Sequence, residues 1–241
     1  MPAFRIKLLS RTEVAEGTMA FFFDKPAGFE YKAGQSGDFT LLAPPETDAE
    51  GNTRAFSIAN PPHENELMIS TRTRNTAFKR VLRSMPIGTE LQLEGPFGAM
   101  TLHNNSARPA VLLAGGIGIT PFRSMLFHAA KALLPHRLFL FYSNRYPEAA
   151  AFLEELLDLE QHNPNYRLVA TMDESGGTHR EWHGEKGHLT GEMLKRHLPT
   201  LEGPIYYVAG PPAMVSGLQK MLNEAGINDD DIRSESFSGY P

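Results

Sequence analysis

The amino-acid sequence predicts a two-domain protein, in which an N-terminal six-stranded antiparallel β-barrel precedes a C-terminal α/β domain with a doubly wound parallel sheet. Three observations lead to this fold class. The chain of 241 residues exceeds a typical domain of about 150 residues. Its N-terminal part contains short β-like runs between turn residues, and the remainder alternates strand-like with helix-like segments. We place the domain boundary after residue 104, so that residues 1–104 and 105–241 form the two domains.

The N-terminal part contains six short runs of apolar, β-branched and aromatic residues, which Gly, Pro, Asn and Asp separate at the spacing of an antiparallel barrel. The predicted strands are residues 4–9, 18–23, 36–42, 54–59, 67–72 and 89–94. One helix interrupts them, since apolar residues recur at helical spacing and form a single stripe: Phe78, Val81, Leu82 and Met85. We expect Thr76 to cap this helix and Pro86 to end it.

The C-terminal part changes to an alternation of strands and helices. It opens with a continuous apolar run at residues 110–114, which is typical of a strand buried on both faces. Further strands are predicted at residues 137–142, 166–171, 205–208 and 232–237, and helices at residues 122–129, 148–160, 191–197 and 212–225. The polar segment 173–187 is expected to be a surface loop. Its His179, Trp182 and His183 lack the spacing of metal ligands, so we predict no metal site.

Composition and charge exclude several classes of protein. The chain has 23 Lys and Arg against 28 Asp and Glu, a net charge of −5, and no cysteine. A mildly acidic chain without a basic block is not expected to bind nucleic acid, and no apolar run reaches the roughly 20 residues needed for membrane insertion. The absence of cysteine excludes disulfides, thiol nucleophiles and cysteine-ligated iron–sulfur clusters in this chain. A cytoplasmic location is expected.

The strongest local signal is the sequence Ala-Gly-Gly-Ile-Gly-Ile-Thr-Pro at residues 114–121, which follows a predicted buried strand and opens a predicted helix. Glycines let a phosphate approach the backbone, and a helix N-terminus supplies N–H donors. We expect Thr120 to cap this helix and Pro121 to take its first position. The turn therefore predicts a phosphate site. Pro121 stands where the strict dinucleotide fingerprint has its last glycine, which disfavours a standard dehydrogenase domain.

A second constellation lies on the predicted strand at residues 54–59, where Arg54, Phe56 and Ile58 alternate with Ala55, Ser57 and Ala59. Arginine offers a forked donor for phosphate, phenylalanine a stacking plane, and serine a single hydrogen bond. In isolation this pattern also suits a strand with one exposed arginine.

Further motifs recur in one order along the chain. They are Tyr-Lys-Ala-Gly-Gln at residues 31–35, Gly-Pro-Phe-Gly at 95–98, Ala-Gly-Pro-Pro at 209–212 and Ser-Glu-Ser-Phe at 234–237. With the two constellations above, they make the sequence resemble the ferredoxin–NADP reductase superfamily from about Tyr31 to Phe237.

The resemblance implies that the barrel binds FAD and the α/β domain binds a nicotinamide nucleotide. Arg54 would contact the flavin pyrophosphate, Phe56 would stack on the isoalloxazine ring, and Ser57 would hydrogen-bond near flavin N5. The full set of implied flavin contacts is Arg54, Phe56, Ser57, Ile58, Met68, Ile69, Ser70, Asn75, Thr76 and Ala77. The implied nicotinamide-nucleotide contacts are Gly115, Gly116, Gly118, Thr120, Ser143, Arg145, Gly210 and Pro211.

Three residues are expected to act in the reaction itself: Ser57, Glu235 and Phe237. By resemblance, Glu235 and Phe237 approach the flavin and nicotinamide from the C-terminal end, although Tyr240 is an alternative to Phe237 as the covering aromatic. Ala209 stands where the family commonly has a cysteine near the nicotinamide.

The choice between NADPH and NADH depends on the residues that follow the second parallel strand. Ser143, Asn144 and Arg145 come there, with no acidic residue before Glu148. An acidic residue favours NADH, whereas an arginine favours the 2′-phosphate of NADPH. The sequence therefore favours NADPH, with NADH left open.

The resemblance implies a flavoprotein oxidoreductase that transfers a hydride from NAD(P)H to FAD and passes electrons to a separate acceptor. That acceptor would be a ferredoxin, a flavodoxin, an oxygenase component, or a free flavin or ferric chelate, because this chain holds no iron–sulfur cluster. One alternative is a non-catalytic flavin- or nucleotide-binding regulatory module. Another, a flavin-independent dehydrogenase, leaves the Arg54–Ser57 pattern unexplained.

Overall fold

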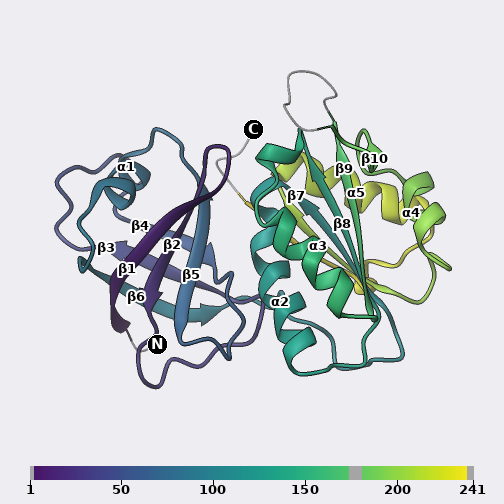
Figure 1. The fold of residues 1–241 in the computed structure, drawn as a ribbon, viewed down its shortest axis with the longest axis horizontal. Helices are drawn as coiled ribbons and strands as arrows, with labels where there is room; N and C mark the ends of the chain where they lie inside the picture. The colour runs from purple at the N-terminus through teal and green to yellow at the C-terminus, as the bar shows by residue number, and fades with distance from the viewer. Residues whose placement is uncertain (1–2, 174–180, 238–241) are drawn as a thin grey trace.

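The computed structural model describes residues 3–173 and 181–237, which form two six-stranded sheets lying next to each other (Figure 1). The first sheet is antiparallel, in the order β4-β3-β6-β1-β2-β5. Its strands are β1 (Ala3–Ala15), β2 (Thr18–Asp24), β3 (Ser36–Leu41), β4 (Thr53–Ser57), β5 (Glu66–Arg72) and β6 (Glu90–Phe97). The predicted antiparallel arrangement is confirmed.

Inward side chains alternate with outward ones along the strands of the first sheet, and the sheet curls around the inward set. The inward set is apolar and fully buried, and it includes Ile6, Leu8, Phe21, Phe23, Phe39, Leu41, Leu91 and Leu93. The two edge strands approach each other where the Ala59 amide donates a hydrogen bond to the Met68 carbonyl at 2.8 Å. Helix α1 (Ala77–Ser84) packs Phe78, Val81 and Leu82 into the same core.

The second sheet is parallel, in the order β10-β9-β8-β7-β11-β12, with helices on both faces. Helices α2 (Ile119–Lys131) and α3 (Leu153–His162) pack on one face, and α4 (Gly191–His197) and α5 (Pro212–Glu224) on the other. The strands are β7 (Ala110–Gly115), β8 (Leu138–Asn144), β9 (Tyr166–Met172), β10 (Glu185–Lys186), β11 (Ile205–Gly210) and β12 (Ile232–Ser236). The predicted doubly wound sheet is confirmed. Chain order reverses between β7 and β11, and ligands of such sheets bind at the carboxyl ends of the strands at this point.

Some predicted boundaries are wrong. The helix predicted at residues 148–160 is a short 3₁₀ turn (Pro147–Ala149) followed by α3, because Phe152 takes a left-handed conformation with φ of 63°. Residues 149–152 are almost fully buried, so tertiary packing overrides helix propensity there. Strand β10 lies within the segment expected to be a loop, and its two residues show no strand pattern. His179 lies outside the described residues.

The two halves share one apolar interface, formed by α2 against the barrel. Arg123 donates to the Ala59 carbonyl at 3.0 Å and pairs with Glu155 at 2.6 Å. The Ser124 hydroxyl donates to the Asn60 carbonyl at 2.5 Å. Side chains of α2 thus donate hydrogen bonds to main-chain carbonyls of the barrel. These bonds hold the two halves in a fixed position on either side of the cleft.

The predicted domain boundary after residue 104 falls between β6 and β7 and remains a proposal. On its N-terminal side, the His103 amide already donates to the Tyr207 hydroxyl of β11 at 2.8 Å. A domain boundary placed a few residues earlier would therefore keep the His103–Tyr207 hydrogen bond within the C-terminal domain.

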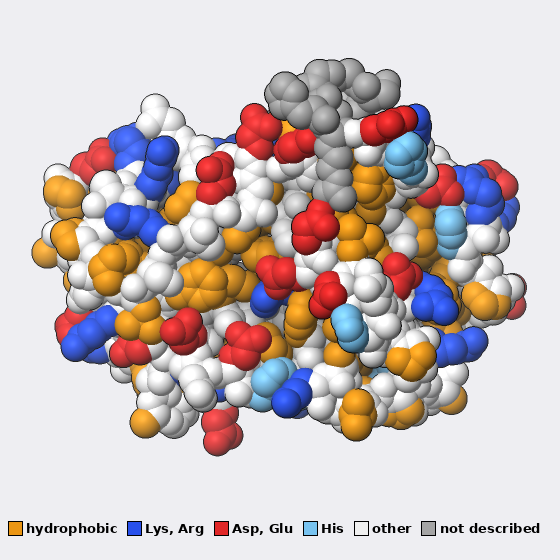
Figure 2. Space-filling model, in the orientation of Figure 1, with side chains coloured by type: hydrophobic (Ala, Val, Ile, Leu, Met, Phe, Trp, Pro, Cys, Tyr) orange, Lys and Arg blue, Asp and Glu red, His pale blue; other side chains and the backbone are white. Residues whose placement is uncertain are grey.

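The surface drawn in Figure 2 shows acidic side chains along the middle of this face and basic side chains mainly toward its ends. Among the described residues on this face, no continuous basic patch is visible of the kind that suits a phosphate backbone. Within residues 3–173 and 181–237, no helix has the length and apolar character needed to cross a membrane.

Candidate functional site

Two adjoining cavities open at the cleft between the halves. The barrel cavity, of about 600 Å³, is lined by β4, the start of α1 and the end of β12. The sheet-edge cavity, of about 770 Å³, lies at the carboxyl ends of β7 and β8 beside α5. Arg74 and Ile117 line both cavities. Two ligands bound there would therefore meet at these residues.

The barrel cavity brings together residues that the sequence placed in different motifs. Eight of the expected site residues line it: Arg54, Phe56, Ser57, Ser70, Thr76, Thr120, Glu235 and Phe237. The Ser57 and Thr76 hydroxyls are buried there without a hydrogen-bond partner. Buried polar groups are normally satisfied, so two unsatisfied hydroxyls in one cavity indicate a polar ligand.

Phe56 is held in a fixed orientation by two other rings. Its ring centroid lies 5.8 Å from Phe39, edge to face, and 5.8 Å from Phe78. The Phe56 side chain is only half-buried and lines the cavity. A partly exposed aromatic plane beside an unsatisfied hydroxyl suits a flat heteroaromatic ligand such as an isoalloxazine.

Arg54 and the start of α1 are occupied by carboxylates of this chain. The Arg54 guanidinium pairs with Glu50 at 2.8 Å and with Asp48 at 3.3 Å. The second Asp48 oxygen accepts a hydrogen bond from the Ala77 amide at 2.9 Å. The predicted cap by Thr76 is therefore wrong, since Asp48 satisfies the first turn instead.

Glu235 contributes a carboxyl group to the barrel cavity from β12. Burial raises the pKa of this carboxyl group. The chain is fixed here because β12 pairs with β11 and the Phe237 amide donates to the Gly210 carbonyl at 2.9 Å. A carboxyl group with a raised pKa can hold a proton nearer neutral pH than an ordinary glutamate. Tyr240, the alternative to Phe237, lies outside the described residues.

Several expected flavin contacts do not line the cavity with their side chains. Ile58, Met68 and Ile69 are at most 2% exposed and belong to the apolar cores. Asn75 accepts two hydrogen bonds from Arg80, at 2.9 Å each, through its carbonyl and its side-chain oxygen. The flavin roles expected for these residues remain predictions.

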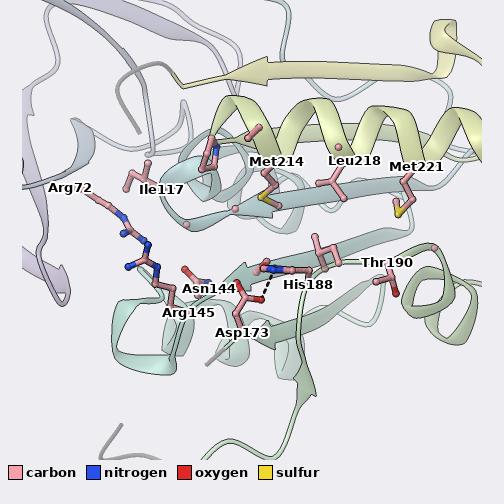
Figure 3. Close-up of a pocket in the computed structure, with 18 of the residues that line it drawn as sticks. Arg72, Ile117, Asn144, Arg145, Asp173, His188, Thr190, Met214, Leu218 and Met221 are labelled. Atoms are coloured by element: carbon pink, nitrogen blue, oxygen red, sulfur yellow. Dashed lines mark ion pairs between the residues drawn. The ribbon is translucent and has the colours of Figure 1, made fainter. Parts of the chain in front are cut away.

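The sheet-edge cavity has a basic end and an apolar wall (Figure 3). Arg72 and Arg145 point toward one another at one end, whereas Met214, Leu218 and Met221 of α5 form the wall. The expected residues that line it are Gly115, Gly116, Ser143, Arg145 and Pro211. Two like charges directed at one place favour an anion between them, and the apolar wall suits a base or ribose.

Arg72 is a site residue that the sequence reasoning missed. It ends β5 of the barrel yet lies 3.1 Å from the position that a Cβ atom of Gly116 would take. The signal available in the sequence was the pair of arginines at positions 72 and 74, immediately before the residues assigned to the flavin. Only the approach of the two halves brings Arg72 to the glycine turn.

The glycine turn after β7 needs its glycines mainly for packing. A Cβ atom on Gly118 would lie 2.1 Å from the Ala209 carbonyl oxygen, and one on Gly115 would lie 2.0 Å from the Met214 sulfur. Gly116, with φ of +50°, borders the cavity. The glycine turn thus packs directly against the end of β11 and the start of α5, which fixes it at the carboxyl edge of the sheet.

Thr120 does not cap α2 as predicted, because the helix begins at Ile119 after a 3₁₀ turn (Gly116–Gly118). Its hydroxyl donates to the Ile117 carbonyl at 3.0 Å. Thr120 lines the barrel cavity and not the sheet-edge cavity. Gly118 and Gly210 do not line the sheet-edge cavity.

Comparisons with known proteins agree with the two-domain fold. Residues 112–220 match the oxidoreductase NAD-binding domain. Reductase component 2 of terephthalate 1,2-dioxygenase from Comamonas sp is 25% identical over 241 residues, covering 99% of this chain and 69% of that protein. A ferredoxin NADP+ reductase from Neisseria gonorrhoeae, solved with bound FAD and NADP, aligns with a TM-score of 0.80 at 21% identity and covers 97% of this chain and 98% of that one. The FAD/NAD-binding domain of nitric oxide dioxygenase from Vibrio cholerae aligns with a TM-score of 0.83 at 20% identity over 97% of this chain and 98% of that one.

The fold, the paired cavities and the NAD-binding domain define a class of two-domain oxidoreductases. Residues 112–220 match an oxidoreductase NAD-binding domain, and the whole chain is similar in sequence and fold to ferredoxin reductase-type FAD- and NAD-binding proteins, in agreement with the resemblance of its motifs. It spans 69% of the Comamonas reductase component. Terephthalate and the dioxygenase, which the name of that reductase component mentions, are properties of the Comamonas protein.

Proposed function

We propose that this protein transfers a hydride from NAD(P)H to FAD and passes the electrons to a separate acceptor. The observation that supports this most strongly is the pair of adjoining cavities that share Arg74 and Ile117. One cavity offers an aromatic plane with an unsatisfied hydroxyl, and the other offers paired arginines beside a glycine turn. Bound FAD would supply the redox chemistry, since it accepts two electrons from a hydride and releases them singly.

The residues of the barrel cavity would orient the flavin. Phe56 would lie against the ring, and the Ser57 hydroxyl would find its missing partner at the N5 edge. Glu235, whose pKa is raised by burial, would hold a proton close to the same edge. Phe237 would cover the ring from the C-terminal side.

The sheet-edge cavity would hold the nicotinamide nucleotide. Its pyrophosphate would lie at Gly116 under Arg72, and Arg145 would face the 2′-phosphate of NADPH. Ser143 and Pro211 would border the ribose and the nicotinamide end. Ala209 leaves no thiol near the nicotinamide, so positioning depends on Glu235 and the neighbouring backbone.

An oxygenase component or a ferredoxin is the acceptor that best fits the similarity to a dioxygenase reductase component. A flavodoxin, free flavin and ferric chelates remain further candidates. A cytoplasmic location is part of the same proposal.

Steady-state assays of the flavin-loaded protein test the proposal, with ferricyanide as an acceptor that needs no docking surface. We expect oxidation of NADPH, with NADH used at a higher KM. A protein that binds FAD but oxidises neither nucleotide would be a binding module, and failure to bind FAD would refute the assignment of the barrel cavity.

A further inference from the structure

The segment between β3 and β4 places two carboxylates against the positively charged rim of the barrel cavity. Asp48 and Glu50 contact the Ala77 amide and Arg54 at that rim, whereas Glu46 pairs with Arg80 outside the cavity. We infer that Asp48 and Glu50 hold the donors that would bind the flavin phosphate, so that flavin binding must displace them. This inference rests on the proposed function, because it names the residues that compete with the flavin at the same site.

Asp48 bridges the two features that would bind a phosphate. One carboxylate oxygen accepts from the Ala77 amide at the start of α1, at 2.9 Å, and the other lies 3.3 Å from the Arg54 guanidinium. The hydrogen bond from Ala77 is the main reason why the pKa of Asp48 lies below its usual range. Asp48 is therefore ionised at neutral pH and acts as an oxyanion in this position.

Glu50 completes the occupation of Arg54. Its carboxylate lies 2.8 Å from the same guanidinium nitrogen, and the Arg54 side chain also donates to the carbonyls of Glu50 and Gly51, at 2.9 and 3.1 Å. Glu50 itself lines the barrel cavity. Arg54 thus points toward residues 48–51 and not into open space.

Glu46 holds the segment without entering the phosphate site. It accepts a hydrogen bond from the Arg80 side chain at 3.0 Å, and Arg80 also donates to Asn75, two residues before α1. Glu46 does not line the barrel cavity. It therefore has the same charge and belongs to the same segment, but lacks the contacts with Arg54 and Ala77.

Carboxylates and phosphates recognise the same donors, namely guanidinium groups and N–H groups at a helix N-terminus. Helix α1 has no acidic residue in its own first turn, so Asp48 supplies the negative charge there from a distant segment. The side chains of Asp48 and Glu50 are 32% and 69% exposed, and pairs exposed to this degree are weak. A flavin phosphate can displace them at small cost, which makes the flavin an exchangeable ligand.

The experiment compares four proteins: wild type, Asp48→Asn, the double variant Asp48→Asn/Glu50→Gln, and the control Glu46→Gln. Affinity for FAD and for riboflavin is measured by flavin-fluorescence quenching, and thermal melting is measured without flavin. We expect the double variant to bind FAD about tenfold more tightly and the single variant about threefold, as weak exposed pairs predict. Riboflavin, which has no phosphate, should bind all four proteins equally.

Melting without flavin provides a readout independent of binding. Because the carboxylates stabilise the flavin-free rim, the double variant should melt at a lower temperature than wild type while binding FAD more tightly. Unchanged or weaker FAD binding in the double variant would refute the inference and leave the proposed function intact. An equal gain in Glu46→Gln, or an equal gain for riboflavin, would also refute it. If neither the wild type nor any of the variants binds FAD, the proposed function itself fails.

Hydrogen exchange of the wild-type protein covers the case in which the double variant does not fold. FAD should increase amide exchange in residues 46–51, since these residues lose their contacts with Arg54 and Ala77. Unchanged or slower exchange of that segment on FAD binding would overturn the inference.

Discussion

Replacing Ser57 with alanine should make the flavin-free protein more stable and the flavin-loaded enzyme slower. The Ser57 hydroxyl is buried without a hydrogen-bond partner, and the residue is 6% exposed. An unsatisfied buried hydroxyl costs about 1–3 kcal/mol, so Ser57→Ala should raise the free energy of unfolding by about 1 kcal/mol. For a chain of this size that corresponds to a rise of about 2–4 °C in Tm. With FAD bound, loss of one hydrogen bond of about 1.4 kcal/mol should slow flavin reduction about tenfold.

Calorimetry of the flavin-free protein and anaerobic stopped-flow reduction of the loaded protein measure the two effects. Ser124→Ala is the matched control, because Ser124 is also buried but its hydroxyl donates to the Asn60 carbonyl at 2.5 Å. That control should lower Tm. A fall in Tm for Ser57→Ala similar to that of the control would refute the assignment of Ser57 as a ligand-facing hydroxyl, as would unchanged reduction kinetics.

Three further predictions concern the carboxyl group, the interface and the nucleotide site. Burial raises the pKa of Glu235, so the stability that its carboxyl group contributes is complete below the usual glutamate pKa and is lost as pH rises through the raised value. The Tm of Glu235→Gln should therefore exceed that of wild type at pH 8 but not at pH 4. A difference in Tm that does not depend on pH would contradict this prediction. Arg123→Ala removes the Glu155 pair and leaves the Ala59 carbonyl unsatisfied, so unfolding in denaturant should show a loss of about 2 kcal/mol, whereas wild-type stability would contradict the interface description. Arg145→Ala should raise the KM for NADPH about tenfold and leave the KM for NADH nearly unchanged, and equal effects on both would remove the 2′-phosphate role.

The fold class could be predicted because its signals are local. Short apolar and aromatic runs between turn residues, such as residues 18–23, mark strands of the antiparallel sheet, and the continuous apolar run at residues 110–114 marks a strand covered on both faces. The glycine turn after that strand also could be found, because its position between strand and helix is visible in sequence. The structure adds the physical reason, which is the close approach of Ala209 and Met214.

The missed features depend on contacts between distant residues. Asp48 caps α1 from 29 residues away, while Thr76 has the residue type and position of a cap but makes no cap bond. Phe152 leaves the helical conformation because its surroundings are buried, although the local sequence favours a helix. Arg72 reaches the glycine turn only because the two halves pack together. Local propensity contains no information on any of these contacts.

The most direct test of the central claim is an anaerobic absorbance spectrum of the FAD-loaded protein before and after one equivalent of NADPH. Hydride transfer between the adjoining cavities predicts that the visible flavin band bleaches, and that NADH gives the same change more slowly. A flavin band that persists with both nucleotides would contradict the account, because the two cavities would then hold their ligands without bringing them together.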